Sequence, residues 1–394
     1  MGVENLVLSS LLRLDSFVVK EQFKGYDPYD VLASPLPLKI LGTKLCYYLT
    51  QLNKRDPYKI LRTGLAVPKQ YVPKGLALFI ESYSIWDKAG LGSKKEELQF
   101  LKRELDALRA PGYGDKFCWG LNYQYATSLK YVPSLFPSLV VTAYVHRAYH
   151  SFMKHHEEFD FKDQLESSVR FLLEDLERTY EPEGLCFSYY TVKKDIVYNA
   201  NAKGGEMLAR MYSMTQNQEY LDLATSVMDH TVGHQKEDGR WNYRKLEDGS
   251  ERKQIDFHQL YMVECLDKFV RFSGNTDEKF LKSIDLGIDF YLNNQLKDEQ
   301  LCYYRWPKYW PIDIHNQASG IIALTRLSDR RPELFEIAKK MAHYTIENMQ
   351  LPSGGFMYQK HKNYTNKTSY IRWANAWMHL ALTTVIDKLR SENT

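Results

Sequence analysis

Apolar residues recur at helical spacing along most of the chain. The stretch FHQLYMVECLDKFVRF (257–272) places apolar side chains three and four positions apart, whereas period-two alternation is confined to short pieces such as RWNYRK (240–245). The pattern therefore predicts a mainly helical protein. The expected helices span residues 6–23, 36–53, 73–89, 93–109, 134–152, 159–178, 197–214, 217–232, 256–273, 276–294, 313–327, 331–348 and 371–391.

The connections between these helices alternate in kind. One connection is short and polar, and the next is long and rich in Tyr and Trp. Helical hairpins repeated in this way bury their faces only by stacking on one another. Each repeat is an aromatic loop, an inner helix and an outer helix, roughly 55 to 60 residues in all. The aligned segments are residues 183–211, 238–266, 299–327 and 353–382.

The repeat predicts a closed ring, an all-α toroid of the (α/α)6 type with six or seven hairpins, within one domain of residues 1–394. Helix 371–391 ends the chain without a polar cap, and helix 6–23 lacks an outer partner of its own. We expect these two helices to pair and close the ring. The inner helices would then begin at one mouth, together with the aromatic loops.

Composition narrows the class of protein. The 394 residues are 44% hydrophobic and 26% charged, which suits a large folded core. A net charge of +3, with both signs spread along the chain, gives no footprint for nucleic acid. No apolar run reaches the length of a membrane span, and the five cysteines include no Cys-x-x-Cys pair. We expect no signal peptide. We expect a cytoplasmic protein without a cofactor.

Two similar motifs, IDFHQ (255–259) and IDIHN (312–316), begin predicted inner helices. Their aspartates are interpreted as helix caps, and the spacing of Asp256 and Gln259 resembles a capping box. An imidazole adds nothing to a cap, so we expect the histidines to face a ligand. Alignment by these motifs puts four residues in one column: Asn199, His258, His315 and Ala374.

A metal site is the alternative for two Asp-x-His pairs. Residues two apart on a helix diverge by roughly 200°, so one residue of each pair would face a shared ion. No further ligand is marked by spacing, and we predict no metal. The candidate catalytic residues are His258, His315, Tyr198, Asp256, Asp313 and Asp30.

The aromatic loops indicate a glycan. Sugar rings stack on aromatic side chains, and their hydroxyls need planar hydrogen-bond partners. Lys and Arg at the rim favour an acidic sugar. The alternative is that many of these rings hold the loops against the helix ends. The candidate substrate-binding residues are Tyr26, Asp27, Trp119, Asn122, Asn199, Trp241, Tyr243, Tyr304, Trp306, Asn316, Tyr358, Arg372, Trp373 and Asn375.

The stretch GYDPYD (25–30) allows two interpretations. Asp27 and Asp30 flank a proline turn, where Asp commonly bonds its own backbone. Their density with Tyr26 and Tyr29 also suits a binding site.

Several stretches resemble an uncharacterised family of bacterial and archaeal α/α-toroid proteins encoded with surface-polysaccharide biosynthesis genes. They are GYDPYD, CWGLNY (118–123), the Pro…Thr-Ala segment (137–143), VYNANAKGGEMLAR (197–210) and KNYTNKTSYIRWANAWMHLAL (362–382). The resemblance covers most of the chain. It implies a six-hairpin, glycosidase-like toroid in the same pathway, and it carries no established reaction.

Our leading interpretation is a carbohydrate-active enzyme that works by hydrolysis, elimination or epimerisation. Hydrolysis requires two facing carboxylates, and the candidates are Asp27, Asp30, Asp115, Asp256 and Asp313. Proton transfer at a uronate requires His or Tyr with a neutralising Arg or Asn. The repeated positions favour this second set: His258, His315, Tyr198, Tyr304, Asn316 and Arg372.

Two other functions remain open. A non-catalytic glycan-binding or scaffold protein would use the same aromatic loops. A terpene cyclase is a minor alternative, because QKEDGRW (235–241) matches the Gln-x3-Gly-x-Trp loop of triterpene cyclases and QLPSGGF (350–356) is a looser copy. The chain has no Asp-rich acid motif, so the loop is interpreted as scaffold.

Overall fold

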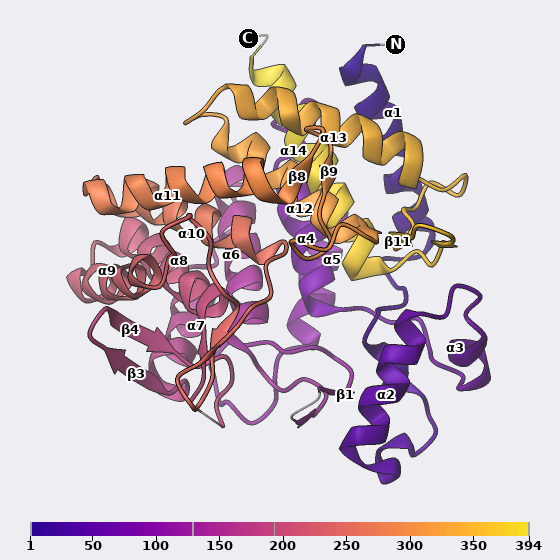
Figure 1. The fold of residues 1–394 in the computed structure, drawn as a ribbon, viewed down its shortest axis with the longest axis horizontal. Helices are drawn as coiled ribbons and strands as arrows, with labels where there is room; N and C mark the ends of the chain where they lie inside the picture. The colour runs from indigo at the N-terminus through magenta and orange to yellow at the C-terminus, as the bar shows by residue number, and fades with distance from the viewer. Residues whose placement is uncertain (1, 128–129, 193, 393–394) are drawn as a thin grey trace.

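Six helical hairpins form a closed ring in the computed structural model (Figure 1), which describes residues 2–127, 130–192 and 194–392. Each inner helix contacts the next, and α14 returns to α4. The first helix, α1, is the outer partner of α14, as predicted, and both termini lie at the top of Figure 1. The chain is an (α/α)6 toroid. Its inner helices are α4 (Pro73–Ser84), α6 (Leu139–His155), α8 (Tyr198–Thr215), α10 (His258–Ser273), α12 (Ile314–Leu327) and α14 (Trp377–Ser391); their outer partners are α5 (Lys95–Ala107), α7 (Lys162–Asp175), α9 (Gln218–Gly233), α11 (Glu278–Phe290), α13 (Glu333–Met349) and α1 (Val3–Lys20).

Three helix boundaries depart from the prediction for visible reasons. The α6 helix begins at Leu139 rather than 134, because Ser138 is its N-cap and accepts from the Val141 N–H at 3.3 Å. The last inner helix opens with a π-helical turn, η4 (Ile371–Ala376), before α14. The helix expected over 36–53 is divided at Gly42, whose φ of 78° ends the short helix η2 (Leu38–Leu41).

The segment between α1 and α4 lies outside the ring. It contains η1 (Asp30–Ala33), η2, α2 (Gly42–Lys54) and α3 (Ile60–Gly64), and we call residues 31–65 the α2–α3 lobe. The lobe lies at the lower right of Figure 1 and has a small apolar cluster of its own, with Cys46 among its buried residues. The ring therefore has six hairpins, and the helix predicted over 36–53 is not a member of a seventh.

Short strands occur in the long loops at the mouth of the ring. They form antiparallel pairs and triplets, for example with Ile196 opposite Lys245. Strands of two to four residues explain why period-two alternation is so brief in the sequence. The strands are β1 (Tyr125–Ala126), β2 (Tyr131–Val132), β3 (Arg178–Glu181), β4 (Gly184–Phe187), β5 (Ile196–Val197), β6 (Arg244–Lys245), β7 (Glu251–Arg252), β8 (Leu296–Lys297), β9 (Leu301–Cys302), β10 (Ile312–Asp313), β11 (Gln359–Lys360) and β12 (Thr365–Asn366); a π-turn, η3 (Tyr291–Gln295), precedes β8.

A repeated side-chain amide fixes each loop to its inner helix. The four amides follow one another at a spacing of 58 residues, and each accepts a hydrogen bond from a loop backbone N–H. A buried N–H left unpaired costs about 1–3 kcal/mol, so these contacts set the register of loop and helix. The pairs are Asn201 with Phe187 (2.9 Å), Gln259 with Trp241 (3.1 Å), Gln317 with Cys302 (2.7 Å) and Asn375 with Phe356 (2.9 Å).

The Gln-x3-Gly loops connect each hairpin to the next outer helix. The Gln235 amide donates to the carbonyls of Gly239 and Ser283, at 2.9 and 3.0 Å. In the second copy, the Gln350 amide donates to the carbonyls of Gly354 and Ser10, at 2.9 and 3.0 Å. Gly354 has a φ of 97°, and a Cβ there would lie 2.3 Å from a carbonyl of α1. These loops are structural, as the sequence interpretation held.

Candidate functional site

Three rings at the starts of successive inner helices pack together at the mouth. The Phe257 and His315 rings are 4.2 Å apart, and the His315 and Trp373 rings are 4.4 Å apart. Counted from the amides at 259, 317 and 375, these three residues occupy equivalent positions in the repeat. The column predicted from the two motifs is therefore wrong by one residue. Phe257, not His258, is the equivalent of His315, and Asn316 is the equivalent of His258.

Asp256 holds His258 at the start of α10. Its Oδ1 lies 2.5 Å from Nδ1 of His258 and accepts the His258 backbone N–H at 3.2 Å. Gln254 and Arg305 approach the other oxygen, at 2.9 and 3.6 Å. Burial alone would raise the pKa of Asp256, but His258 and Arg305 outweigh it and the pKa is lowered. The capping box with Gln259 does not form, because that amide bonds the loop.

The other ring nitrogen of His258 faces the mouth. The side chain remains 17% exposed, beside the Tyr243 ring at 5.0 Å. Within the described part of the chain, no protein group forms a hydrogen bond to Nε2. A carboxylate that accepts Nδ1–H leaves the Nε2 lone pair available, which is the arrangement of a general base.

Asp313 makes different contacts at the start of α12. Its carboxylate accepts from the His315 backbone N–H (2.9 Å), Gln359 Nε2 (2.6 Å) and Trp373 Nε1 (3.1 Å). Burial raises the pKa of Asp313 to about 6. Asp313 is thus the predicted N-cap of α12, and it leaves the imidazole of its own motif without a carboxylate partner.

His315 is buried among rings. Its Nε2 lies 2.6 Å from the Tyr261 hydroxyl, and its Nδ1 has no partner among the described residues. Burial lowers the pKa of His315 well below its ordinary value, and the charges of Lys74 and Arg372 lower it further. The ring is therefore neutral at physiological pH.

Two buried lysines lie close to Tyr144 and Tyr261, and one of them, Lys74, has no close carboxylate among the described residues. Lys74 Nζ lies 4.0 Å from the centroid of Tyr144 and 5.2 Å from that of Trp377, and it forms no ion pair with a described residue. Burial and neighbouring cations lower its pKa well below the ordinary value. Lys203 Nζ lies 4.5 Å from the centroid of Tyr144 and 5.0 Å from that of Tyr261, with a carboxylate oxygen of Glu206 at 4.0 Å.

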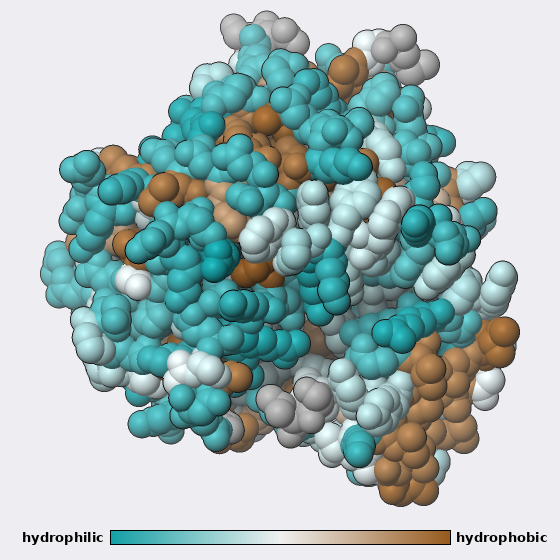
Figure 2. All heavy atoms as spheres, viewed as in Figure 1, coloured by the Kyte–Doolittle hydropathy of each residue, from teal (hydrophilic) through white to brown (hydrophobic). Residues whose placement is uncertain are grey.

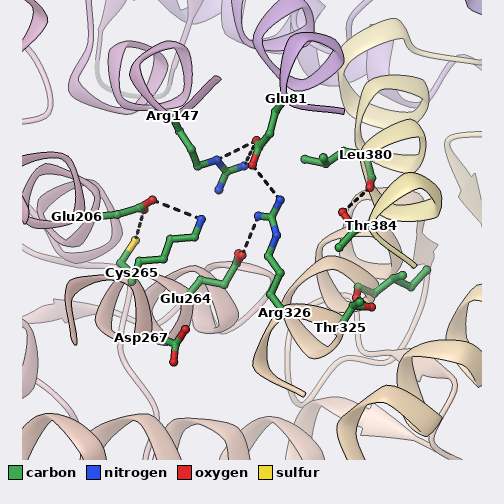
Figure 3. Close-up of polar contacts among 12 residues, drawn as sticks. Glu81, Arg147, Glu206, Glu264, Cys265, Asp267, Thr325, Arg326, Leu380 and Thr384 are labelled. Atoms are coloured by element: carbon green, nitrogen blue, oxygen red, sulfur yellow. Dashed lines mark hydrogen bonds and ion pairs between the residues drawn. The ribbon is translucent and has the colours of Figure 1, made fainter. Parts of the chain in front are cut away.

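An ion-pair network fills the ring axis deeper still. Figure 3 shows Arg147 and Arg326 converging on Glu81 from different helices, at 2.7 and 2.8 Å, with Glu264 bonded to Arg326 at 3.2 Å. With Lys74 and Lys203 included, the described residues of this network comprise six basic side chains and three carboxylates, an excess of basic groups. They are Lys74, Arg147, Lys203, Arg210, Lys268 and Arg326, against Glu81, Glu206 and Glu264.

The GYDPYD stretch is bound to the last hairpin by arginine. Arg372 binds both oxygens of Asp27, at 2.6 and 2.8 Å, and Arg62 binds Asp30 at 2.8 Å and faces the Tyr26 ring. Burial raises the pKa of Asp30 to about 6 in spite of Arg62. Both carboxylates are fully buried, so their geometry supports the structural interpretation of the turn.

Tyr29 is the residue of this stretch that reaches the mouth. Its ring lies 5.9 Å from that of Trp373, and the ammonium of Lys54 lies 3.4 Å above it. Burial lowers the pKa of Lys54 to about 7. The sequence had indicated Tyr29 only through its density with Tyr26 and the two aspartates. Lys54, Lys74 and Tyr261 were absent from the sequence-based candidates, because their contacts join distant hairpins.

The remaining candidates divide by position. Tyr243 and Tyr304 lie at the mouth, where burial and the Asp256 and Asp313 charges raise the pKa of Tyr304 to about 12. Four of the others donate hydrogen bonds that fix loops: Trp119 to the Leu105 carbonyl, Trp241 to the Thr231 carbonyl, Asn122 to Gln70 and Asn316 to the Tyr303 carbonyl. Asn375 accepts from the Phe356 N–H, while Trp306 packs on Phe290 and Tyr358 packs on Tyr370. Asn199 is buried, and its Oδ1 has no partner among the described residues.

Tyr198 lies apart from the mouth cluster, beside a group that resembles a metal site. Its hydroxyl donates to Glu251, and its ring packs on His234. Glu181, His230 and His234 bring three ligand atoms within 4.8 Å of one another. However, Asn201 Nδ2 points at Nδ1 of His230, at 3.3 Å, so the ring hydrogen is assigned to Nε2, which donates to Glu181. No lone pair of His230 then remains for an ion.

The chain shares its fold with enzymes that act on sugars. An α-mannanase of Bacteroides thetaiotaomicron (family 76) is 14% identical, with a TM-score of 0.64, over 82% of this chain and 88% of that one. A cellobiose 2-epimerase from Bacillus thermoamylovorans is 12% identical, with a TM-score of 0.59 (81% and 90%). An unsaturated glucuronyl hydrolase specific for heparin is 12% identical, with a TM-score of 0.63 (100% and 98%).

These likenesses establish the toroid and leave the reaction open. No family model and no curated protein sequence matches the chain. Among the described residues, no helix has the length and apolarity to cross a bilayer.

Proposed function

We propose that the protein is a sugar isomerase or epimerase in which His258 transfers the proton. The observation that carries this proposal is the Asp256–His258 pair, 2.5 Å apart, with Nε2 open to an aromatic mouth. Toroids of this kind include proteins described as cellobiose 2-epimerase and D-mannose isomerase, which makes the reaction class compatible with the fold.

The proposed chemistry needs no oxidant. His258 Nε2 removes the proton from the carbon next to the carbonyl of an open-chain sugar, and Asp256 stabilises the imidazolium that results. The electron pair moves to the carbonyl oxygen, where Arg305 supplies the positive charge. Return of the proton to the carbonyl carbon, with the proton of the neighbouring hydroxyl passing to the enediolate oxygen, gives the isomer. Return to the original carbon after the planar enediolate has rotated to present its opposite face gives the epimer.

Two-carboxylate hydrolysis has less support from the geometry. Asp27 and Asp30 are each held by an arginine, and Asp256 by His258. Asp313 accepts three hydrogen bonds, and Asp115 pairs with Arg170 on an outer helix. A nucleophile or acid facing a partner across the mouth would need at least one of these carboxylates to be released.

An acidic substrate is supported by the donors beneath the rings. Lys74 lacks an anionic partner, and Trp377 Nε1 is buried without an acceptor among the described residues. A ligand that brings acceptor oxygens and negative charge, such as a uronate, would accept the indole N–H of Trp377 and favour the protonated form of Lys74, against the effect of burial. The resemblance noted in the sequence adds the proposal that this sugar belongs to surface-polysaccharide assembly.

The test incubates the protein with D-glucose, D-mannose, cellobiose and D-glucuronate, and follows products by NMR. We expect interconversion without cleavage, and Lys74→Met is expected to weaken turnover of glucuronate while sparing neutral sugars. Lys88→Met, at an exposed pair with Asp387, is the matched control. Release of a smaller sugar from cellobiose would indicate hydrolysis, and binding without any conversion would indicate the non-catalytic alternative.

A further inference from the structure

The α2–α3 lobe exposes large apolar side chains on its outer side. Ile40, Tyr58 and Ile60 are 77%, 82% and 72% exposed. Figure 2 shows the result as one continuous hydrophobic area at the lower right, over the lobe, on a face that is otherwise mainly hydrophilic. Apolar patches of this kind mark interaction surfaces. The exposed residues are Leu36, Ile40, Leu41, Leu45, Tyr48, Leu52, Tyr58 and Ile60, which we call the apolar tip.

Folding of the lobe does not explain the apolar tip. Helix α2 buries Cys46, Thr50 and Asn53 against the lobe, while Leu45 and Leu52 stand on the solvent side. The helix therefore directs two of its three leucines outward, while Leu49 packs on the cluster of the lobe and the small polar residues Thr50 and Asn53 lie inward. A surface helix usually has its apolar side chains on the buried face.

Positive charge surrounds the apolar tip. Residues 31–65 contain six basic residues and a single acid, Asp56, although the whole chain has a net charge of only +3. The even spread of charge inferred from composition is thus wrong for this segment. Asp56 is engaged locally, accepting the backbone N–H of Leu61 at 2.7 Å. Lys39, Lys44, Arg55 and Lys59 form no ion pair with a described carboxylate.

We propose that the apolar tip docks on an anionic phospholipid surface. Ile40, Leu45 and Leu52 enter the interface between headgroups and acyl chains, and Lys39 and Lys44 contact the lipid phosphates. This combination of an apolar face with flanking lysines is what an interfacial helix requires. A second copy of the chain is disfavoured as the occupant, because it would bring two basic rims together.

Docking in this way places the mouth of the ring beside the membrane. The α2 helix ends at Lys54, whose ammonium lies over Tyr29, and Tyr29 packs toward Trp373. A glycan carried on a lipid would then meet the mouth at the bilayer surface. The docking itself does not depend on the reaction proposed above, since it is read out as membrane binding.

The test is flotation of the full-length protein with vesicles of phosphatidylcholine alone, or with about 30% phosphatidylglycerol. We expect binding to the anionic vesicles that weakens as salt rises. Lys39→Gln with Lys44→Gln should weaken it roughly 25-fold, since each lysine near such a surface contributes about fivefold. Ile40→Ser with Leu52→Ser should weaken it more than tenfold, and Tyr180→Ser, at a 70% exposed tyrosine elsewhere, should not.

Three outcomes would overturn the proposal. The first is a wild-type protein that floats no better with anionic vesicles than without lipid. The second is unchanged binding after Ile40→Ser with Leu52→Ser, with the circular dichroism spectrum retained. The third is a concentration-dependent dimer by light scattering that the same pair of substitutions abolishes while vesicle binding is absent, which would assign the apolar tip to a second copy.

Discussion

The starts of α10 and α12 carry nearly the same five residues and have different chemistry. In α10, Asp256 bonds the side chain of His258, which remains accessible. In α12, Asp313 bonds Gln359 and Trp373, and His315 lies buried against Tyr261. Both aspartates accept the backbone N–H of the histidine two residues on, so the local motif fixes this contact. The register of the helix against its loop decides where the imidazole points.

The difference arises from one residue of offset. Asp256 precedes its loop-bonding amide, Gln259, by three positions, whereas Asp313 precedes Gln317 by four. One residue rotates a helical side chain by about 100°. His315 therefore takes the place of Phe257 in the ring stack, and His258 points elsewhere.

The largest expected effect is on turnover by the aspartate variants. Asp256→Asn removes the carboxylate that orients His258 and stabilises the imidazolium formed in the reaction, so we expect kcat on the sugar that the wild type converts to fall on the order of 10³-fold. Asp313→Asn keeps a capping oxygen at α12 and should change kcat by only a few-fold. Equal losses in the two variants would contradict separate roles for the two motifs.

The next effect is on stability against pH. The folded pKa of Asp313, about 6, lies above the unfolded value. Its carboxyl therefore favours the folded state most below the unfolded pKa, and this contribution of about 3 kcal/mol is lost as pH rises through 6. The free energy of unfolding of Asp313→Asn, measured relative to the wild type, should therefore increase as pH rises from about 4.5 to 7.5.

The matched comparison is Asp256→Asn. The pKa of Asp256 is lowered, so its contribution is present above the unfolded value and is lost only in stronger acid. Urea unfolding should therefore show a nearly constant deficit for this variant over the same pH range. A parallel pH dependence of the two variants would show that the two carboxyls share one environment.

The smallest effect concerns the bond between His315 and Tyr261. His315→Phe keeps a ring in the stack but leaves the buried Tyr261 hydroxyl without its partner at 2.6 Å, so we expect a loss of about 1–2 kcal/mol in the free energy of unfolding. Adding Tyr261→Phe should restore most of that loss. Additive losses of unfolding free energy in the double variant would show that the hydrogen bond between His315 and Tyr261 does not contribute to stability.

Much of the fold could be predicted because the helical period and the loop alternation are local signals. The six hairpins, the pairing of α1 with α14 and the capping role of Asp313 follow from them. Glycine at 42 and the caps at Ser138 shifted boundaries, which propensity alone does not resolve.

The candidate site was less accessible from sequence. Arg372 meets Asp27 across 345 positions, and Lys74 meets Trp377 across the closure of the ring. An alignment by motif placed His258 and His315 together, because one residue of offset in a helix is invisible until the loop contacts are known. The basic excess of residues 31–65 was the one missed signal that a local charge count would have found.

The most direct test of the central claim is solvent deuterium incorporation into the converted sugar, measured by NMR for His258→Asn and His315→Phe side by side. The account predicts that His258→Asn loses carbon-bound exchange by at least 10²-fold, while His315→Phe retains most of it. Exchange at the wild-type rate in His258→Asn, or its loss only in His315→Phe, would contradict the assignment of proton transfer to His258.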